Sequence, residues 1–139
     1  MKYYSYRHIV GFEETNLVSN VYFVNYLRWQ GKCREMFLRD HAPDVLQDLK
    51  HGLALFTVSC SCDYLAEITA FDELDIQMSL KLAGQNQIAM GFEYWRVTDT
   101  GRELIARGKQ HIACMRRQDG KNVPTPIPTS LHAALERYK

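Results

Sequence analysis

Three features between residues 16 and 34 have the chemistry to bind an oxygen atom that carries or develops negative charge. Asn16 has a side-chain amide, which donates and accepts hydrogen bonds but cannot act as a carboxylate base. Arg34 has a planar guanidinium that carries only donors. A helix expected to begin near Tyr22 adds backbone N–H groups without intrahelical partners, at the positive end of the helix dipole.

Each of these features also has an ordinary structural interpretation. Asn16 suits a turn, where its side chain bonds the local backbone. Arg34 lies about two turns after Tyr26 on an otherwise apolar helix face, where an ion pair or a side chain that reaches solvent is common. Ser19 or Asn20 would serve as a cap for the helix start. The residues alone therefore leave both interpretations open.

Other reactive residue types form no recognisable site. The serines lack a Gly-x-Ser-x-Gly turn, the glycines form no phosphate-binding loop, and the histidines show no metal or triad spacing. Cys60 and Cys62 lack a neighbouring His or Cys cluster, so we expect small buried apolar side chains. The sequence therefore predicts neither a metal nor a bound cofactor.

Length and composition predict one domain that spans residues 1–139. The net charge of +1 argues against nucleic acid as the main partner. No apolar run approaches the roughly 18 residues of a membrane-spanning helix, and the first residues lack a signal-peptide pattern. We therefore expect a cytoplasmic protein without a membrane partner.

The candidate residues need a long helix, and the spacing of apolar residues predicts one over residues 22–39. Apolar side chains cover more than one of its faces, which indicates that other structure surrounds it. Gly31, inside this helix, is expected to contact a neighbouring backbone closely. Pro43 interrupts the helix, and a second helical piece is expected over residues 43–50.

Strands flank this helix on both sides in the sequence. They are predicted over residues 2–11, 54–64, 76–82, 88–98 and 103–117, with turns at 83–87 and 98–101 and a terminal helix from Ser130. Ala54, Phe56, Val58, Cys60, Cys62 and Tyr64 are expected on one face, and Ile76, Met78, Leu80 and Leu82 on the buried face of the next strand. Consecutive hairpins favour an antiparallel sheet. We therefore expect an α+β fold with a curved sheet of about five strands around one central helix.

Three stretches of the sequence resemble a known family. They read FEETNLVSNVYFVNYLRWQGKCREMFL (12–38), CDYLAEITAFDELDIQMSL (62–80) and GRELIARGKQHIACMRRQDGKNVPTPIP (101–128). Together they resemble the hot-dog-fold thioesterases of the 4-hydroxybenzoyl-CoA thioesterase type. Within that group they are most similar to the thioesterases of enediyne polyketide biosynthesis.

The resemblance assigns roles to particular residues. The catalytic Asp of the family falls on Asn16, and its small residue before Val-Tyr falls on Asn20. The resemblance implies that the backbone N–H of Phe23 binds the oxyanion. It also implies that Arg34 directs its donors at the acyl carbonyls, braced by the Tyr26 hydroxyl.

Four carboxylates remain as substitute bases for the missing Asp. Glu13 and Glu14 precede the motif and are expected to face solvent. Glu67 lies at a strand corner and remains a candidate for the catalytic base. Glu93, in the strand predicted over residues 88–98, is the fourth.

The family implies hydrolysis of a long polyunsaturated 3-oxoacyl thioester, after which the 3-oxo acid loses CO2. A phosphopantetheine arm on the acyl carrier domain of an iterative polyketide synthase would deliver the substrate. The family also implies a homo-oligomer, a dimer or homotetramer, with the acyl site between protomers. A general acyl-CoA thioesterase and a non-catalytic acyl-binding module are the alternatives.

Overall fold

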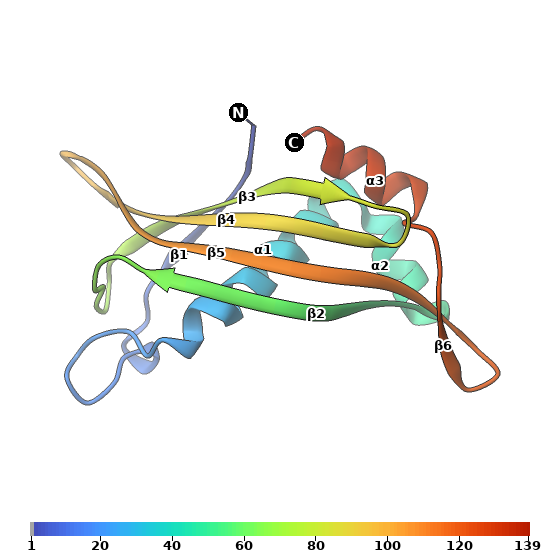
Figure 1. Cartoon of the computed structure of the whole chain (residues 1–139). Coiled ribbons are helices and arrows are strands. Elements are labelled where there is room, and N and C mark those ends of the chain that lie inside the picture. Colours follow the sequence, from blue (N-terminus) through green and yellow to red (C-terminus); the bar gives the residue numbers. More distant parts are fainter. Residues whose placement is uncertain (1) are drawn as a thin grey trace.

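A computed structural model describes residues 2–139, in which one long helix lies against one face of an antiparallel sheet (Figure 1). The helix is α1 (Val24–His41). The strand order is β1 (Tyr4–Ile9), β3 (Glu73–Ala83), β4 (Gln87–Thr98), β5 (Gly101–Gln118) and β2 (Leu53–Tyr64), and β6 (Lys121–Pro124) pairs with β5. This arrangement confirms the predicted α+β architecture and adds β6, which the sequence did not predict.

Shorter helices complete the chain. A 3-10 turn, η1 (Phe12–Glu14), precedes the loop that leads to α1, and η2 (Leu49–His51) precedes β2. The helix α2 (Pro43–Asp48) follows α1, with Pro43 at its first position, where the missing N–H has no intrahelical role. The last helix, α3 (Thr129–Glu136), packs beside α1 and β3. None of the helices between residues 2 and 139 has the length and apolar character needed to cross a membrane.

The core lies between α1 and the sheet. Trp29, Cys33 and Phe37 of α1 are at most 3% exposed and belong to one cluster with Ile76 and Met78 of β3. Gly31 lies elsewhere on α1, and no atom of another part of the described chain would come within 4 Å of a Cβ placed there. The predicted close backbone contact at Gly31 is therefore wrong.

A bulge in β2 changes which of its side chains face α1. The pairing with β5 shifts between Thr57 and Ser59, so Val58 is an extra residue in the strand. Before the bulge, Leu53 and Leu55 face the core, and after it Cys62 does. The predicted single face from Ala54 to Tyr64 is therefore wrong in its first half. Cys60 is exposed, which also corrects its predicted burial.

A second irregularity affects the end of β3. Ile76, Met78 and Leu80 are buried as predicted, but Leu82 is 66% exposed. The pairing of β3 with β4 shifts between Leu80 and Leu82, so Lys81 is the extra residue there. Period-two alternation continues only until such a shift reverses the faces.

Candidate active site

The start of α1 presents free backbone donors. The N–H groups of Phe23 and Val24 have no hydrogen-bond partner within residues 2–139, and no side chain caps the helix at Phe23. The Tyr64 hydroxyl donates to the Phe23 carbonyl at 2.9 Å, which leaves the N–H of the same residue untouched. The donor that the family resemblance assigns to oxyanion binding therefore has no partner in residues 2–139, and neither Ser19 nor Asn20 caps it.

Asn16 closes the exposed loop that precedes this helix. Its Oδ1 accepts hydrogen bonds from the backbone N–H groups of Val18 (3.0 Å) and Asn20 (3.3 Å). Its own N–H donates to the Asn20 carbonyl at 2.7 Å, and Ser19 turns the chain with φ of 70°. The Nδ2 group of Asn16 has no partner in the described part of the chain. The side chain therefore stabilises the turn with its oxygen while its N–H donors remain available.

Glu14 anchors this loop to the core. Its carboxylate accepts hydrogen bonds from the Trp29 indole (2.7 Å) and the Gly11 N–H (2.8 Å), and it pairs with His8 at 2.9 Å. Its backbone carbonyl accepts from the Tyr22 N–H. Burial alone would raise the pKa of the Glu14 carboxyl, but the hydrogen bonds from Gly11, Trp29 and His8 together lower it. Glu14 is thus an ionised structural anchor, and the expectation that it faces solvent is wrong.

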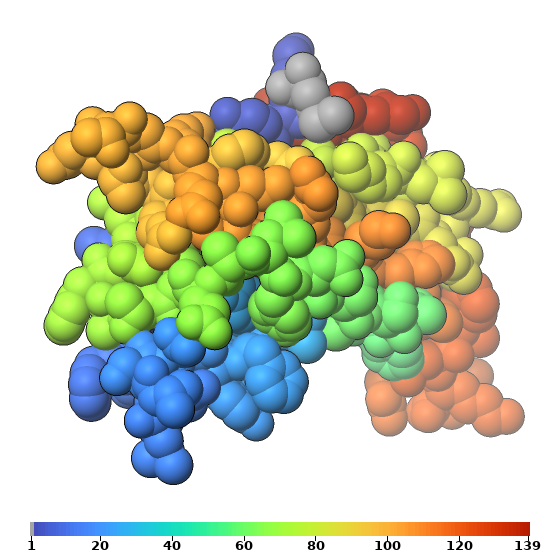
Figure 2. All heavy atoms as spheres, turned by 60° about the vertical axis from the view of Figure 1, so that its left-hand side comes forward, coloured from blue at the N-terminus to red at the C-terminus, as the bar shows by residue number. Residues whose placement is uncertain are grey.

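The other carboxylates lie elsewhere. Glu13 and Glu67 are exposed, Glu13 as expected and Glu67 in the corner between β2 and β3. Glu93 accepts a hydrogen bond from the Trp95 indole at 3.1 Å. Figure 2 shows the blue Asn16 loop beside the green β2–β3 corner, which an isolated bridge between Asn20 and Thr69 joins. Glu67 is therefore the carboxylate whose segment runs beside the loop.

Arg34 lies further along α1, under β2 and β5. Its Nη1 donates to Gln110 Oε1 at 2.9 Å and, more weakly, to Thr57 Oγ1 at 3.5 Å. Its Nε is fully buried without a partner, whereas Nη2, also without a partner in residues 2–139, keeps accessible surface. No carboxylate within the described residues lies within 4.0 Å of this guanidinium. Burial lowers the pKa of Arg34, and Glu35 only partly offsets this effect. Within residues 2–139, the charged Arg34 side chain is therefore hydrogen-bonded only to neutral groups.

A second polar side chain lies one turn before Arg34. Gln30 is completely buried, and its Nε2 donates to the Ser61 carbonyl of β2 at 2.9 Å, while its Oε1 has no partner. Gly108 of β5 makes room for it, since a Cβ there would lie 2.2 Å from Gln30 Nε2. Gln30, Thr57 and Gln110 were not predicted as part of the site. The sequence does contain an indication of Gln110, because this polar residue interrupts the apolar face that Ile112 and Cys114 continue.

Tyr26 belongs with the helix start rather than with Arg34. Its ring contacts the Tyr64 ring edge to face, with centroids 4.7 Å apart, and its carbonyl accepts from the Tyr94 hydroxyl at 2.7 Å. Burial raises the pKa of the Tyr26 hydroxyl. This hydroxyl is not among the partners of Arg34 in residues 2–139, so the predicted bracing of Arg34 by Tyr26 is not present.

The two donor groups lie far apart within one chain. Phe23 contacts Tyr64, whereas the Arg34 guanidinium contacts Thr57, seven residues earlier on β2. Phe23 at the start of α1 and Arg34 are eleven residues apart, a rise of roughly 16 Å along the helix at 1.5 Å per residue. One small acyl group therefore cannot touch the Phe23 N–H and the Arg34 guanidinium of the same chain together.

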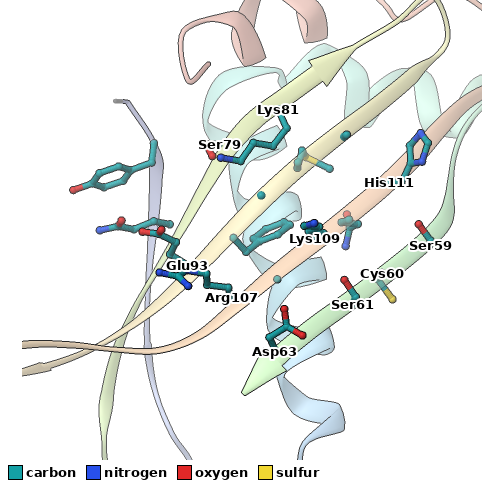
Figure 3. A pocket seen from close by; sticks show the side chains of 18 residues that line it. Ser59, Cys60, Ser61, Asp63, Ser79, Lys81, Glu93, Arg107, Lys109 and His111 are labelled. Carbon is teal, nitrogen blue, oxygen red and sulfur yellow. The ribbon is translucent and has the colours of Figure 1, made fainter. Parts of the chain in front are cut away.

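The opposite face of the sheet has a hollow of about 760 Å³. Figure 3 shows its labelled side chains on β2, β3, β4 and β5, with α1 behind the sheet. Lys81, Arg107 and Lys109 contribute positive charge to it, and Asp63 and Glu93 negative charge. This hollow is separated by the sheet from the Arg34 guanidinium, and of the predicted site residues and candidate bases only Glu93 lines it. Within residues 2–139 no three His, Cys, Asp or Glu side chains group as a metal site.

Comparisons with known proteins identify a family and similar solved structures. The chain matches the family described as the Thioesterase-like superfamily over residues 10–135. Among solved structures it is similar to the dynemicin thioesterase, a structure described in terms of induced fit and allosteric effects upon polyene binding. That protein is 50% identical over 99% of this chain and 97% of its own, with a TM-score of 0.96. Comparison with curated proteins yields no match.

More distant structures share the fold alone. The 1,4-dihydroxy-2-naphthoyl-CoA thioesterase from Synechocystis is 20% identical over 96% of this chain and 95% of its own, with a TM-score of 0.86. The 4-hydroxybenzoyl-CoA thioesterase from a Pseudomonas species is 17% identical over 96% and 99%, with a TM-score of 0.81. These likenesses confirm the predicted hot-dog fold.

Proposed function

The chain belongs to the thioesterase-like superfamily and is a thioester hydrolase, and we propose that its substrate is a long polyunsaturated 3-oxoacyl thioester. The observation that carries this proposal is the charge of Arg34. A guanidinium that is largely removed from water and has no counter-ion is costly unless a ligand compensates it. The oxygen atoms of a 3-oxoacyl group provide that compensation.

The chemistry uses hydrogen-bond donors in place of a carboxylate base. The N–H of Phe23, with the helix dipole behind it, stabilises the negative charge that develops on the thioester oxygen. Water adds to the carbonyl carbon, the C–S bond breaks, and the proton that water loses goes to the thiolate. The released 3-oxo acid then loses CO2 without help from the protein.

We place this reaction between two protomers, because the backbone positions of Phe23 and Arg34 lie roughly 16 Å apart along α1 of one chain. The strand β2 ends the sheet, and Phe56 (42%) and Val58 (56%) are exposed on it. Pairing of two β2 edges would join two sheets into one. Arg34 lies directly under this edge, so a partner protomer would approach it. The assembly is a dimer, or a homotetramer built from two such dimers.

A long acyl chain needs an apolar surface to receive it when it is delivered. The apolar side chains next to Asn16 are strongly exposed, Leu17 at 104% and Val18 at 71%. We propose that they receive the acyl chain, carried on the phosphopantetheine arm of a polyketide synthase carrier domain. The 50% identical dynemicin thioesterase, whose structures concern polyene binding, supports an enediyne pathway. No bound cofactor takes part in this proposal.

Mixing two inactive variants tests the shared site. Asn16→Ala and Arg34→Ala are each expected to lose most hydrolysis of a 3-oxoacyl thioester. When the two are unfolded together and refolded as mixed dimers, one of the two sites regains both residues, so activity returns. No recovery would place both residues in one chain's site, and wild-type rates in both single variants would exclude the site.

Two alternatives predict different substrates. A general acyl-CoA thioesterase would hydrolyse saturated acyl-CoA as fast as a 3-oxoacyl thioester. A non-catalytic acyl-binding module would bind the thioester without turnover. Steady-state rates on both substrates, measured with the assembled wild-type protein, distinguish these from the proposed function.

A further inference from the structure

We infer that Gln110 positions Arg34 for the reaction and keeps its charge free for the substrate. This inference rests on the proposed function, because it gives Gln110 a role only if Arg34 binds substrate oxygen. Gln110 is 5% exposed and accepts the 2.9 Å hydrogen bond from Arg34 Nη1. Gln110 does not itself contact the reacting atoms.

The position of Gln110 in the sheet makes it a rigid support. It lies in β5, where Met90 of β4 pairs with it on one side and Cys60 of β2 on the other. A strand paired on both sides has little freedom to shift. Because the guanidinium is planar, one short hydrogen bond at Nη1 restricts the direction of all its other donors.

The bulge in β2 contributes a second contact. Because Val58 is the extra residue, Thr57 before it shares the core side with Leu55, and its hydroxyl lies 3.5 Å from Arg34 Nη1. With Gln110 and Thr57 both at Nη1, the Nη2 group is left without a protein partner and with accessible surface. Nη2 is therefore the donor that the arrangement offers to a ligand.

The amide of Gln110 matters as much as its position. A Gln oxygen accepts a hydrogen bond but carries no charge, so it orients the guanidinium without neutralising it. A carboxylate at this place would form an ion pair and remove the attraction that Arg34 has for substrate oxygen. The structure therefore assigns to Gln110 part of the selectivity for acyl groups with a second oxygen at position 3.

The test compares a 3-oxoacyl thioester with a saturated acyl thioester of the same length. Gln110→Glu is expected to lower kcat for the 3-oxoacyl substrate by about 10- to 100-fold, a fraction of the loss seen when an oxyanion donor is removed. The saturated substrate, which lacks the second oxygen, should lose less than about threefold. A purely structural defect would lower both rates equally. Gln118→Glu, the same change at the exposed end of β5, is the matched control and should leave both rates unchanged.

A double-mutant cycle shows whether Gln110 acts through Arg34. Gln110→Leu should reduce the 3-oxoacyl preference in the wild type and have no further effect in Arg34→Met, because the group it orients is gone. Unchanged preference in both Gln110→Glu and Gln110→Leu, with loss in Arg34→Met, would overturn this inference and leave the proposed function standing. Unchanged preference in Arg34→Met would instead overturn the proposed function.

Discussion

Arg34 combines features that a structural arginine does not need. Its hydrogen-bond partners are a neutral amide and a neutral hydroxyl, and its Nε has none within residues 2–139. An arginine kept for stability would be expected to pair with a carboxylate. The side chain is therefore better explained by binding than by folding, and the two explanations predict opposite effects on stability.

Replacement of Arg34 by Met is expected to abolish most activity without loss of stability. The Met side chain fills similar volume and removes the desolvation cost of the charge, so the free energy of unfolding should stay equal or rise by about 1 kcal/mol. Urea unfolding followed by fluorescence measures this difference. A decrease of several kcal/mol would show that the charge is structural after all.

Glu14 makes the stability of the Asn16 loop depend on pH. The lowered pKa of this carboxyl means that its ionised form is bound more tightly in the folded protein than in the unfolded chain. The stabilisation is therefore complete above the ordinary carboxyl pKa, about 4.3, and is lost as the pH falls through the folded value. Glu14→Gln should cost about 1–3 kcal/mol at pH 7 and progressively less below pH 4. Denaturation curves at several pH values test this, and a difference that does not change with pH would contradict it.

At the scale of elements, the sequence predicted the helix and the strands better than it predicted their faces. The helix over residues 22–39 and the positions of the strands along the chain were recoverable because hydrophobic periodicity reflects burial directly. The bulges at Val58 and Lys81 were not, because a one-residue insertion depends on pairing with a distant strand. The contact between Arg34 and Gln110 was hidden for the same reason, since 76 residues separate them. The roles of Asn16 and Phe23 came from family resemblance, and local spacing alone left them open.

Two glycines are expected to respond in opposite ways to replacement by Ala. At Gly31 a Cβ meets no atom within 4 Å, so Gly31→Ala should stabilise the protein by about 0.5–1 kcal/mol through helix propensity. At Gly108 a Cβ would lie 2.2 Å from Gln30 Nε2 and 3.1 Å from the Ser61 carbonyl, so Gly108→Ala should destabilise it by about 1–3 kcal/mol. Urea midpoints of both variants against wild type provide the measurement. Equal shifts of both urea midpoints in one direction would refute the interpretation that Gly108, by lacking a side chain, makes room for Gln30.

At the scale of the whole molecule, the fold leaves the site incomplete. The free donors at Phe23 lie at one end of α1, and Arg34 lies in its second half, under the β2 edge. The sheet separates both from the hollow on its other face (Figure 3). A second chain at β2 would therefore complete the site on the α1 side and leave the opposite face of the sheet as it is.

A charge introduced at the β2 edge should separate the protomers and, at the same time, abolish the hydrolysis. Val58→Lys places a charge on an exposed apolar position of this terminal strand, which disfavours edge-to-edge pairing. We expect light scattering to show a fall from two or four chains to one, with loss of 3-oxoacyl hydrolysis in parallel. Leu82→Lys, at an apolar position of similar exposure (66% against 56% for Val58) on an inner strand, should keep both assembly and activity. A monomeric Val58→Lys variant with full activity would show that one chain holds a complete site.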